Sequence, residues 1–146
     1  MSVKLNCYLN FNGNAKEALE FYKDIFNATV EVDTFGEFAA KAPDSGMTFT
    51  PEEADNIMHA SLMGENGIEL MIADSPSGMP PATTGSQLTL TLNGDDNKTL
   101  QGYWDKLSVE GTIGVPLDSA PWGDKFGYLT DKFGVSWMFN ISSPEA

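Results

Sequence analysis

The chain repeats part of its own sequence at a fixed offset of 81 residues, which sharply limits the folds open to it. Residues 9–13 (Leu-Asn-Phe-Asn-Gly) match residues 90–94 (Leu-Thr-Leu-Asn-Gly) without a gap. The match continues into the next segment, where Leu19 aligns with Leu100. Sequence repeats normally encode repeated structural units. Two copies this far apart in a chain of 146 residues indicate two similar halves of one domain.

Each copy is predicted to begin with a strand, a turn and a helix. Apolar side chains at every second position of residues 3–11 predict a strand with one side facing a core. Residues 12–14 (Asn-Gly-Asn) supply a turn and a helix cap, and residues 15–26 carry apolar side chains at helical spacing. Residues 88–107 repeat this order, with Leu88 expected on the core side of the second strand.

Three more strand-like segments follow each predicted helix. They are residues 29–38, 56–63 and 68–73 in the first half, and residues 111–115, 127–130 and 135–139 in the second. Gly64-Glu65-Asn66-Gly67 is expected to form a hairpin turn between two of them. Each half therefore has the order β-α-β-β-β.

The predicted fold class is α+β, with two βαβββ modules that form a cleft-shaped mixed sheet. Residues 1–74 make the first module and residues 87–146 the second. Residues 75–86 are rich in Pro, Gly, Ser and Thr, which is typical of a connector. The whole chain, 1–146, is expected to be a single domain.

The charge and the cysteine content exclude several functions. The net charge is −13, with eight basic residues against twenty-one acidic ones, so nucleic acid and anionic membranes are poor partners. No apolar run approaches the roughly 20 residues that span a bilayer. Cys7 is the only cysteine, which rules out an internal disulfide and a cysteine-based zinc site. Together with the lack of a signal peptide, it leads us to expect a cytoplasmic protein.

Several local strings, taken in order, resemble one known family. They are residues 8–15, 57–60, 70–74, 122–127 and 131–137. With the paired modules, they resemble the PhnB-like branch of the glyoxalase/bleomycin resistance/dioxygenase (vicinal oxygen chelate) superfamily. Some members of this branch carry a demethylubiquinone methyltransferase-like label. The resemblance spans nearly the whole chain, but it fixes no activity because the superfamily includes isomerases, transferases, dioxygenases and drug-binding proteins.

The resemblance also implies where a divalent metal ion, the one cofactor to consider, would bind. Metal-dependent members take His, Gln or Glu ligands from the first and last strands of each module. The repeat pairs Asn6 with Gln87 on the first strands, and Glu69 holds the position on the last strand of the first module. In the second module Met138 stands where a Glu is expected. Only Glu69 and Gln87 are then candidate metal ligands, and otherwise they line a cleft.

His59 is the only histidine in the chain, so one chain has no histidine pair. If Asn66-Gly67 forms a two-residue turn, His59 lies directly opposite Asp74 across the hairpin. Such a pair is either a general acid/base near neutral pH or a structural pair, and we favour the structural role. The same register places Glu69 on the opposite face of the sheet from His59.

The sequence leads to three hypotheses about function. In the first, the cleft binds a small organic molecule, and its metal site is degenerate. The candidate cleft residues are Asn6, Tyr8, Glu69, Gln87, Trp122 and Tyr128. The alternative is a metal-dependent lyase, isomerase or transferase that uses Glu69 and Gln87. A second alternative is a non-catalytic dimeric scaffold. We expect a homodimer in every case, because open sheets expose edges and relatives pair.

Overall fold

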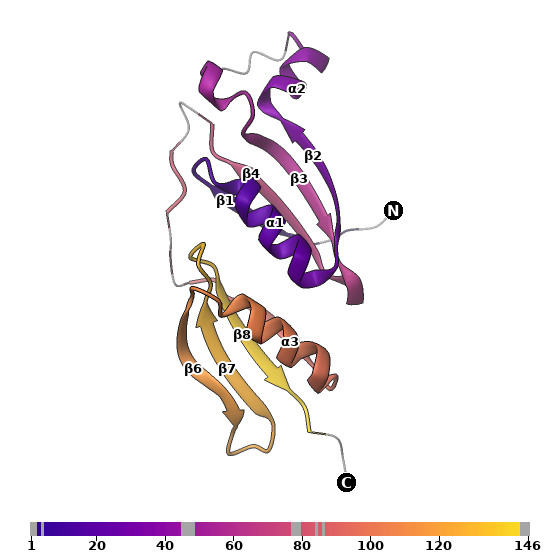
Figure 1. Ribbon diagram of the computed structural model, residues 1–146, viewed down its shortest axis with the longest axis vertical. Helices are drawn as coiled ribbons and strands as arrows, with labels where there is room; N and C mark the ends of the chain where they lie inside the picture. The colour runs from indigo at the N-terminus through magenta and orange to yellow at the C-terminus, as the bar shows by residue number, and fades with distance from the viewer. Residues whose placement is uncertain are drawn as a thin grey trace. The chain divides into compact units, whose positions relative to one another are not determined.

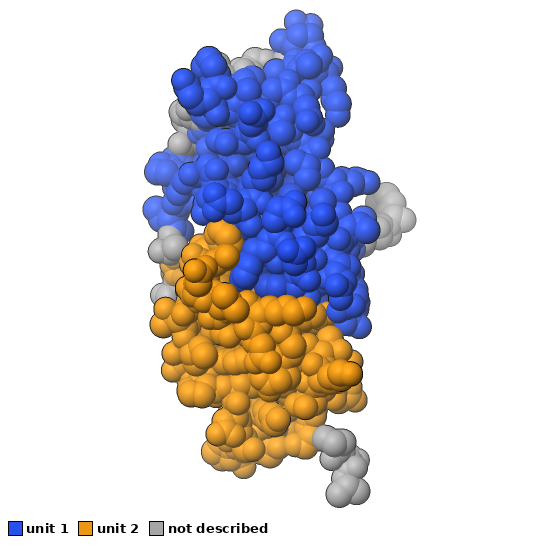
Figure 2. All heavy atoms as spheres, viewed as in Figure 1, with its two compact units in different colours: residues 1–83 blue, residues 84–146 orange. Residues whose placement is uncertain are grey.

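The chain folds into two compact units. The computed structural model describes residues 3, 5–44, 49–76, 80–83, 85 and 87–143. Residues 1–83 form unit 1 and residues 84–146 form unit 2 (Figure 2). Each unit contains its own four-stranded sheet. No helix in the described ranges is long and apolar enough to cross a bilayer.

Unit 1 has one mixed sheet, with strand order β1-β4-β3-β2 (Figure 1). Its elements are β1 (Cys7–Phe11), α1 (Ala15–Phe26), β2 (Thr29–Thr34), α2 (Phe35–Lys41), β3 (Ile57–Met63) and β4 (Glu69–Asp74). Two short 3-10 turns, Pro51–Glu53 and Glu65–Gly67, precede and follow β3. Strand β1 pairs with β4 in parallel, whereas β2-β3 and β3-β4 are antiparallel.

Unit 2 has the same topology, with strand order β5-β8-β7-β6. Its elements are β5 (Leu90–Gly94), α3 (Asn97–Leu107), β6 (Thr112–Ser119), β7 (Lys125–Thr130) and β8 (Ser136–Ile141). Strand β5 pairs with β8 in parallel, as β1 does with β4. The predicted α+β class is confirmed, and both halves have the predicted βαβββ order, with α2 added in unit 1.

The core of unit 1 lies between α1 and its sheet. Helix α1 lies across β3 and β4 (Figure 1) and buries one face. That face carries Ala15, Ala18, Leu19, Tyr22, Ile25 and Phe26. Leu62, Leu70 and Ile72 meet it from the sheet and are buried. Strand side chains alternate between the two faces. We call the face opposite α1 the open face of unit 1.

Helix α3 covers unit 2 in the same way, with a large aromatic contact at the centre. The rings of Trp104 and Phe139 meet edge to face, with centroids 5.2 Å apart. Gly127 on β7 makes room for this contact, because a Cβ there would lie 2.7 Å from the Trp104 ring. The buried Trp137 indole donates a 2.9 Å hydrogen bond to the Asp131 carboxylate. The open face of unit 2 is the face opposite α3.

Three boundary predictions were wrong. Val3 and Leu5 are fully exposed, and Leu88 is 87% exposed, so none of them belongs to a core. The strands begin later, at Cys7 and Leu90, where their parallel partners begin. The expected strand 29–38 ends at Thr34, whose side chain caps α2 by accepting a 3.1 Å hydrogen bond from the Glu37 N–H.

Candidate functional site

The β3-β4 hairpin has a different register from the one that the sequence predicted. Ala60 lies opposite Ile72, and Met63 lies opposite Glu69. The loop spans residues 64–68 and is closed by a 2.7 Å hydrogen bond from the Gly64 N–H to the Ile68 carbonyl. The two-residue turn at Asn66-Gly67 is therefore wrong, and the register moves by one residue. A one-residue shift moves side chains to the other face of a sheet.

Packing against α1 accounts for the longer loop. A Cβ on Gly64 would lie 2.9 Å from the Phe26 Cβ, so this glycine sits directly against the end of α1. Asn66 and Gly67 then reverse the chain with left-handed φ values of 59° and 74°. The turn is thus set by a contact between distant segments. Its local Asn-Gly sequence points to a tighter hairpin.

Asp74, at the end of β4, is a buried carboxylate bound by backbone N–H groups. Its Oδ1 accepts hydrogen bonds from Gly13 N at 2.7 Å and Ala15 N at 3.0 Å, and its Oδ2 accepts one from Ile57 N at 3.0 Å. It joins the β1-α1 turn, the first residue of α1 and the start of β3. The structure therefore does not form the His59–Asp74 pair, and Asp74 has a structural role with other partners.

His59 lies on the open face of unit 1, beside Tyr8. Their ring centroids are 5.9 Å apart. Asp33 is the partner of His59 on β2, and its carboxylate accepts a 2.9 Å hydrogen bond from Lys41 Nζ. Glu69 is paired with Met63 on β3. Met63 is an even number of residues from His59, so its side chain lies on the same face of the sheet as that of His59. His59 and Glu69 thus share a face, contrary to the prediction that they lie on opposite faces.

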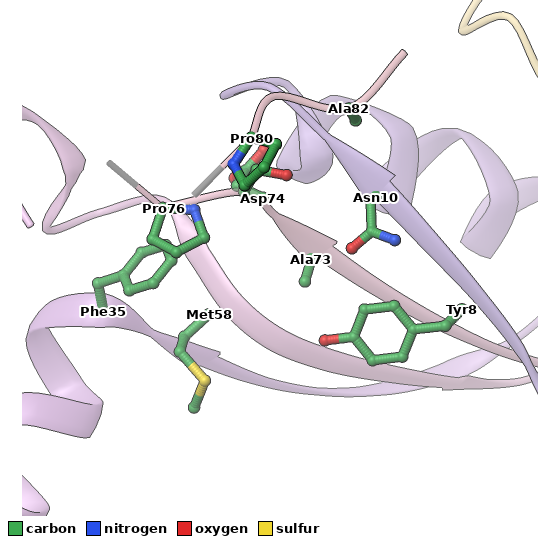
Figure 3. A pocket seen from close by; sticks show the side chains of 10 residues that line it. Tyr8, Asn10, Phe35, Met58, Ala73, Asp74, Pro76, Pro80 and Ala82 are labelled. Atoms are coloured by element: carbon green, nitrogen blue, oxygen red, sulfur yellow. The ribbon is translucent and has the colours of Figure 1, made fainter. Parts of the chain in front are cut away.

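A cavity of about 400 Å³ opens on this face of unit 1. Its size falls within the range of small-molecule sites. Figure 3 shows Tyr8 and Asn10 on one side, Met58 and Phe35 on the other, and Ala73 between them. The remaining lining residues are Asp74, Ser75, Pro76, Pro80 and Ala82. Apolar side chains thus form most of the wall, with the Tyr8 hydroxyl and the Asn10 amide as hydrogen-bonding groups.

Residues 80–82, which follow β4 in the chain, form one wall of this pocket. We call these residues the strap. The Asn12 side chain holds the strap through two hydrogen bonds of 2.8 Å. Its Nδ2 donates to the Ala82 carbonyl, and its Oδ1 accepts from the Ala82 N–H. Directly after β4, the Ser75 N–H donates a 2.7 Å hydrogen bond to the Phe11 carbonyl at the end of β1. Part of the expected connector is therefore a wall of the pocket.

Burial raises the pKa of the Tyr8 phenol above its ordinary value of 10.0, because the phenolate loses hydration. In a pH titration followed by absorbance, the wild-type protein gains a phenolate signal that the Tyr8→Phe variant lacks. We expect this difference between the two proteins to appear above pH 10.0. The raised pKa belongs to the folded state. Its contribution to stability is complete below the ordinary value and is lost as the pH rises through the folded value. Tyr8 is 46% exposed, so its pKa reflects partial burial, and titration at or below 10.0 would contradict that loss of hydration.

The other predicted cleft residues lie in two places. Asn6 is exposed and precedes β1, while Glu69 is exposed at the start of β4. Gln87, Trp122 and Tyr128 belong to unit 2. Gln87 is exposed and precedes β5, so it is not on the predicted strand. The structure therefore places Tyr8 alone of this set in the pocket of unit 1.

Polar and aromatic groups are linked on the open face of unit 2. The Trp122 indole is 60% exposed and donates a 3.3 Å hydrogen bond to the Asn140 side chain. The Asn140 amide in turn donates to Asp124 at 3.1 Å. The Trp122 ring lies 5.7 Å from that of Phe126. Beside them, the Tyr128 hydroxyl donates to Ser136 at 3.0 Å.

The residues around Glu69 do not fit a divalent metal ion. Met63 across the hairpin and Met71 along β4 lie beside it on the open face, and thioethers are weak ligands for such ions. Within the described ranges, no three His, Cys, Asp or Glu side chains come together as a metal site would require.

Sequence reasoning missed most of the pocket. Asn10, Phe35, Met58 and Ala73 line it, and none of them was a candidate. Alternation along β1 puts Asn10 on the same face as Tyr8, so that residue could have been found. Met58 lies beside a register shift between β2 and β3, where alternation fails.

The fold agrees with the comparison with known proteins. The Glyoxalase/Bleomycin resistance protein/Dioxygenase superfamily matches residues 4–139, and the chain belongs to this superfamily. The chain is similar to Protein YjdN of Escherichia coli (strain K12), with 34% identity in an alignment that covers 95% of each protein. This similarity confirms the family that the sequence strings suggested.

Two solved structures extend the comparison. Protein PA1353 from Pseudomonas aeruginosa has a TM-score of 0.81 and 30% identity, covering 98% of this chain and 100% of that one. The putative 3-demethylubiquinone-9 3-methyltransferase, PhnB protein, from Bacillus cereus has a TM-score of 0.73 and 27% identity, covering 96% and 100%. The likeness to the PhnB-like branch thus extends over nearly the whole chain.

Proposed function

We propose that this protein binds a small, mostly apolar organic molecule in the pocket on the open face of unit 1. The observation that supports this most is the 400 Å³ cavity itself, which side chains leave unfilled. Small-molecule sites are mostly apolar, with a few polar groups that orient the ligand. Here Tyr8, Met58 and Phe35 supply the apolar wall, and Asn10 supplies an amide.

The proposal includes no resident metal ion. The pocket lining contains one carboxylate, that of Asp74, and its oxygens accept three backbone hydrogen bonds. Glu69, the best ligand candidate in unit 1, is not among the lining residues and has thioethers beside it. The donor chemistry therefore argues against the alternative of a metal-dependent lyase, isomerase or transferase.

Binding of a neutral fluorescent arene tests the proposal. N-phenyl-1-naphthylamine has 17 non-hydrogen atoms, and an efficiency of about 0.3 kcal/mol per atom gives a Kd on the order of one hundred micromolar. We expect a saturable rise in its fluorescence and a higher midpoint of thermal unfolding in its presence. Removing divalent metals with a chelator should leave both readouts unchanged.

The same titration separates the proposal from the metal-dependent alternative. Protein purified without a metal-affinity tag is examined by elemental analysis and then titrated with and without added nickel, manganese or zinc. Stoichiometric bound metal, or probe binding that appears only with metal, would support the alternative. A probe signal that does not saturate would exclude a defined pocket.

A further inference from the structure

The α1 N-terminus is the feature of unit 1 best suited to an anion, and the protein fills it with its own carboxylate. The N–H groups at a helix N-terminus, together with the helix dipole, favour negative charge. Asp74 Oδ1 already accepts from Gly13 N and Ala15 N at 2.7 and 3.0 Å. This carboxylate is 97% buried and lines the pocket. An anionic ligand would therefore find the N–H groups of Gly13 and Ala15 already occupied by the Asp74 carboxylate.

No positive side chain offsets that charge in the lining of the pocket. All eight basic residues of the chain are lysines, so no arginine fork for phosphate or carboxylate exists. Lys16 and Lys23 lie on α1, and neither is among the lining residues. Lys41 pairs with Asp33 at 2.9 Å. None of the described lysines is therefore among the residues that line the pocket.

The walls of the pocket suit a positive charge. Tyr8 presents an aromatic ring, whose face attracts cations, and Met58 adds a polarisable thioether. Figure 3 shows the Tyr8 hydroxyl and the Asn10 amide near Ala73, where their oxygens carry partial negative charge that favours a cation. The net charge of −13 further raises the local concentration of cations.

We propose that the ligand of this pocket is a small organic cation, an apolar body that carries an ammonium-type charge. The inference rests on the proposed function, since it names the class of molecule that the same pocket takes. The buried carboxylate selects against anions, and the aromatic wall favours the cation over a neutral molecule of the same shape. The selection is thus built into the fold through the contact between Asp74 and α1.

Three competitors of nearly the same shape test the charge preference. They are benzyltrimethylammonium, its neutral carbon isostere neopentylbenzene, and phenylmethanesulfonate, and each is used to displace N-phenyl-1-naphthylamine. We expect the cation to displace the probe at a concentration at least about tenfold lower than the sulfonate does. The neutral isostere should fall between the two. Equal displacement by all three, or the strongest displacement by the sulfonate, would overturn the inference.

Two variants connect the preference to the residues. Tyr8→Leu should reduce the difference between the concentrations at which the cation and the neutral isostere displace the probe. The reason is that it removes an aromatic face and keeps an apolar wall. Asp74→Asn should narrow the gap between the cation and the sulfonate. If Asp74→Asn does not fold, the three competitors on the wild-type protein and on Tyr8→Leu still test the preference for a cation.

The experiment also separates this inference from the proposed function. Saturable probe binding with no charge preference leaves the proposed function standing and overturns the organic cation. No probe binding at all overturns both. Probe binding with the expected order of the three competitors supports both.

Discussion

Replacing Asp74 with alanine is expected to lower the free energy of unfolding by about 3–5 kcal/mol. The side chain is 3% exposed, and three backbone N–H groups would lose their acceptor at once. Hydrogen bonds to charged groups contribute about 1.5–3 kcal/mol each, and buried donors without a partner are costly. Loss of the carboxylate is expected to destabilise two segments, because it binds backbone N–H groups at the start of α1 and at the start of β3.

Urea denaturation of matched variants measures this effect. Asp74→Asn should be milder, at about 2–3 kcal/mol, because the amide oxygen still accepts but its NH₂ group faces an N–H donor. Asp24→Asn, an exposed change on α1, serves as the control and should stay within about 0.5 kcal/mol of wild type. A loss below about 1 kcal/mol for Asp74→Ala would show that water replaces the carboxylate.

The sequence was sufficient to predict the order of elements within each half. The periodicity of α1 identified its buried face correctly, from Ala15 to Phe26. This worked because an amphipathic helix carries its orientation in its own spacing. The repeat added the second half, in which α3 buries Leu100, Tyr103 and Leu107.

Strand ends were less predictable, because a strand ends where its partner ends. Alternation continues through Leu5, yet β1 begins at Cys7, which pairs with Leu70 near the start of β4. Leu5 therefore has the pattern of a strand without a partner strand. Leu88 fails for the same reason, since β5 begins pairing at Leu90 with Trp137.

The site could not be read from local pattern, because its geometry depends on contacts between distant segments. The register of the β3-β4 hairpin follows from Gly64 packing against Phe26. That register puts His59 beside Tyr8 and leaves Asp74 to the backbone of α1. The strap likewise depends on Asn12, 70 residues away from its partner.

Filling the pocket with the change Ala73→Phe is expected to weaken binding of N-phenyl-1-naphthylamine by at least about thirtyfold. Ala73 is the small side chain between Tyr8 and Met58 in the wall, so a phenyl ring at this position occupies the space of the probe (Figure 3). A thirtyfold loss corresponds to about 2 kcal/mol of binding free energy. Ala73 is itself buried, so the added ring is also expected to cost about 1–3 kcal/mol of folding stability, which thermal unfolding of the variant measures.

Thr91→Phe is the matched control for this change. The repeat aligns Thr91 with Asn10, and Thr91 is exposed on the open face of unit 2, opposite Met138 of β8. The same ring is thus added in unit 2 at the counterpart of Asn10, the strand neighbour of Ala73, and outside the pocket. We expect this variant to bind the probe with wild-type affinity. If both variants bind equally well and both unfold at the wild-type temperature, the probe sits elsewhere, because a folded Ala73→Phe protein has no room for it in unit 1.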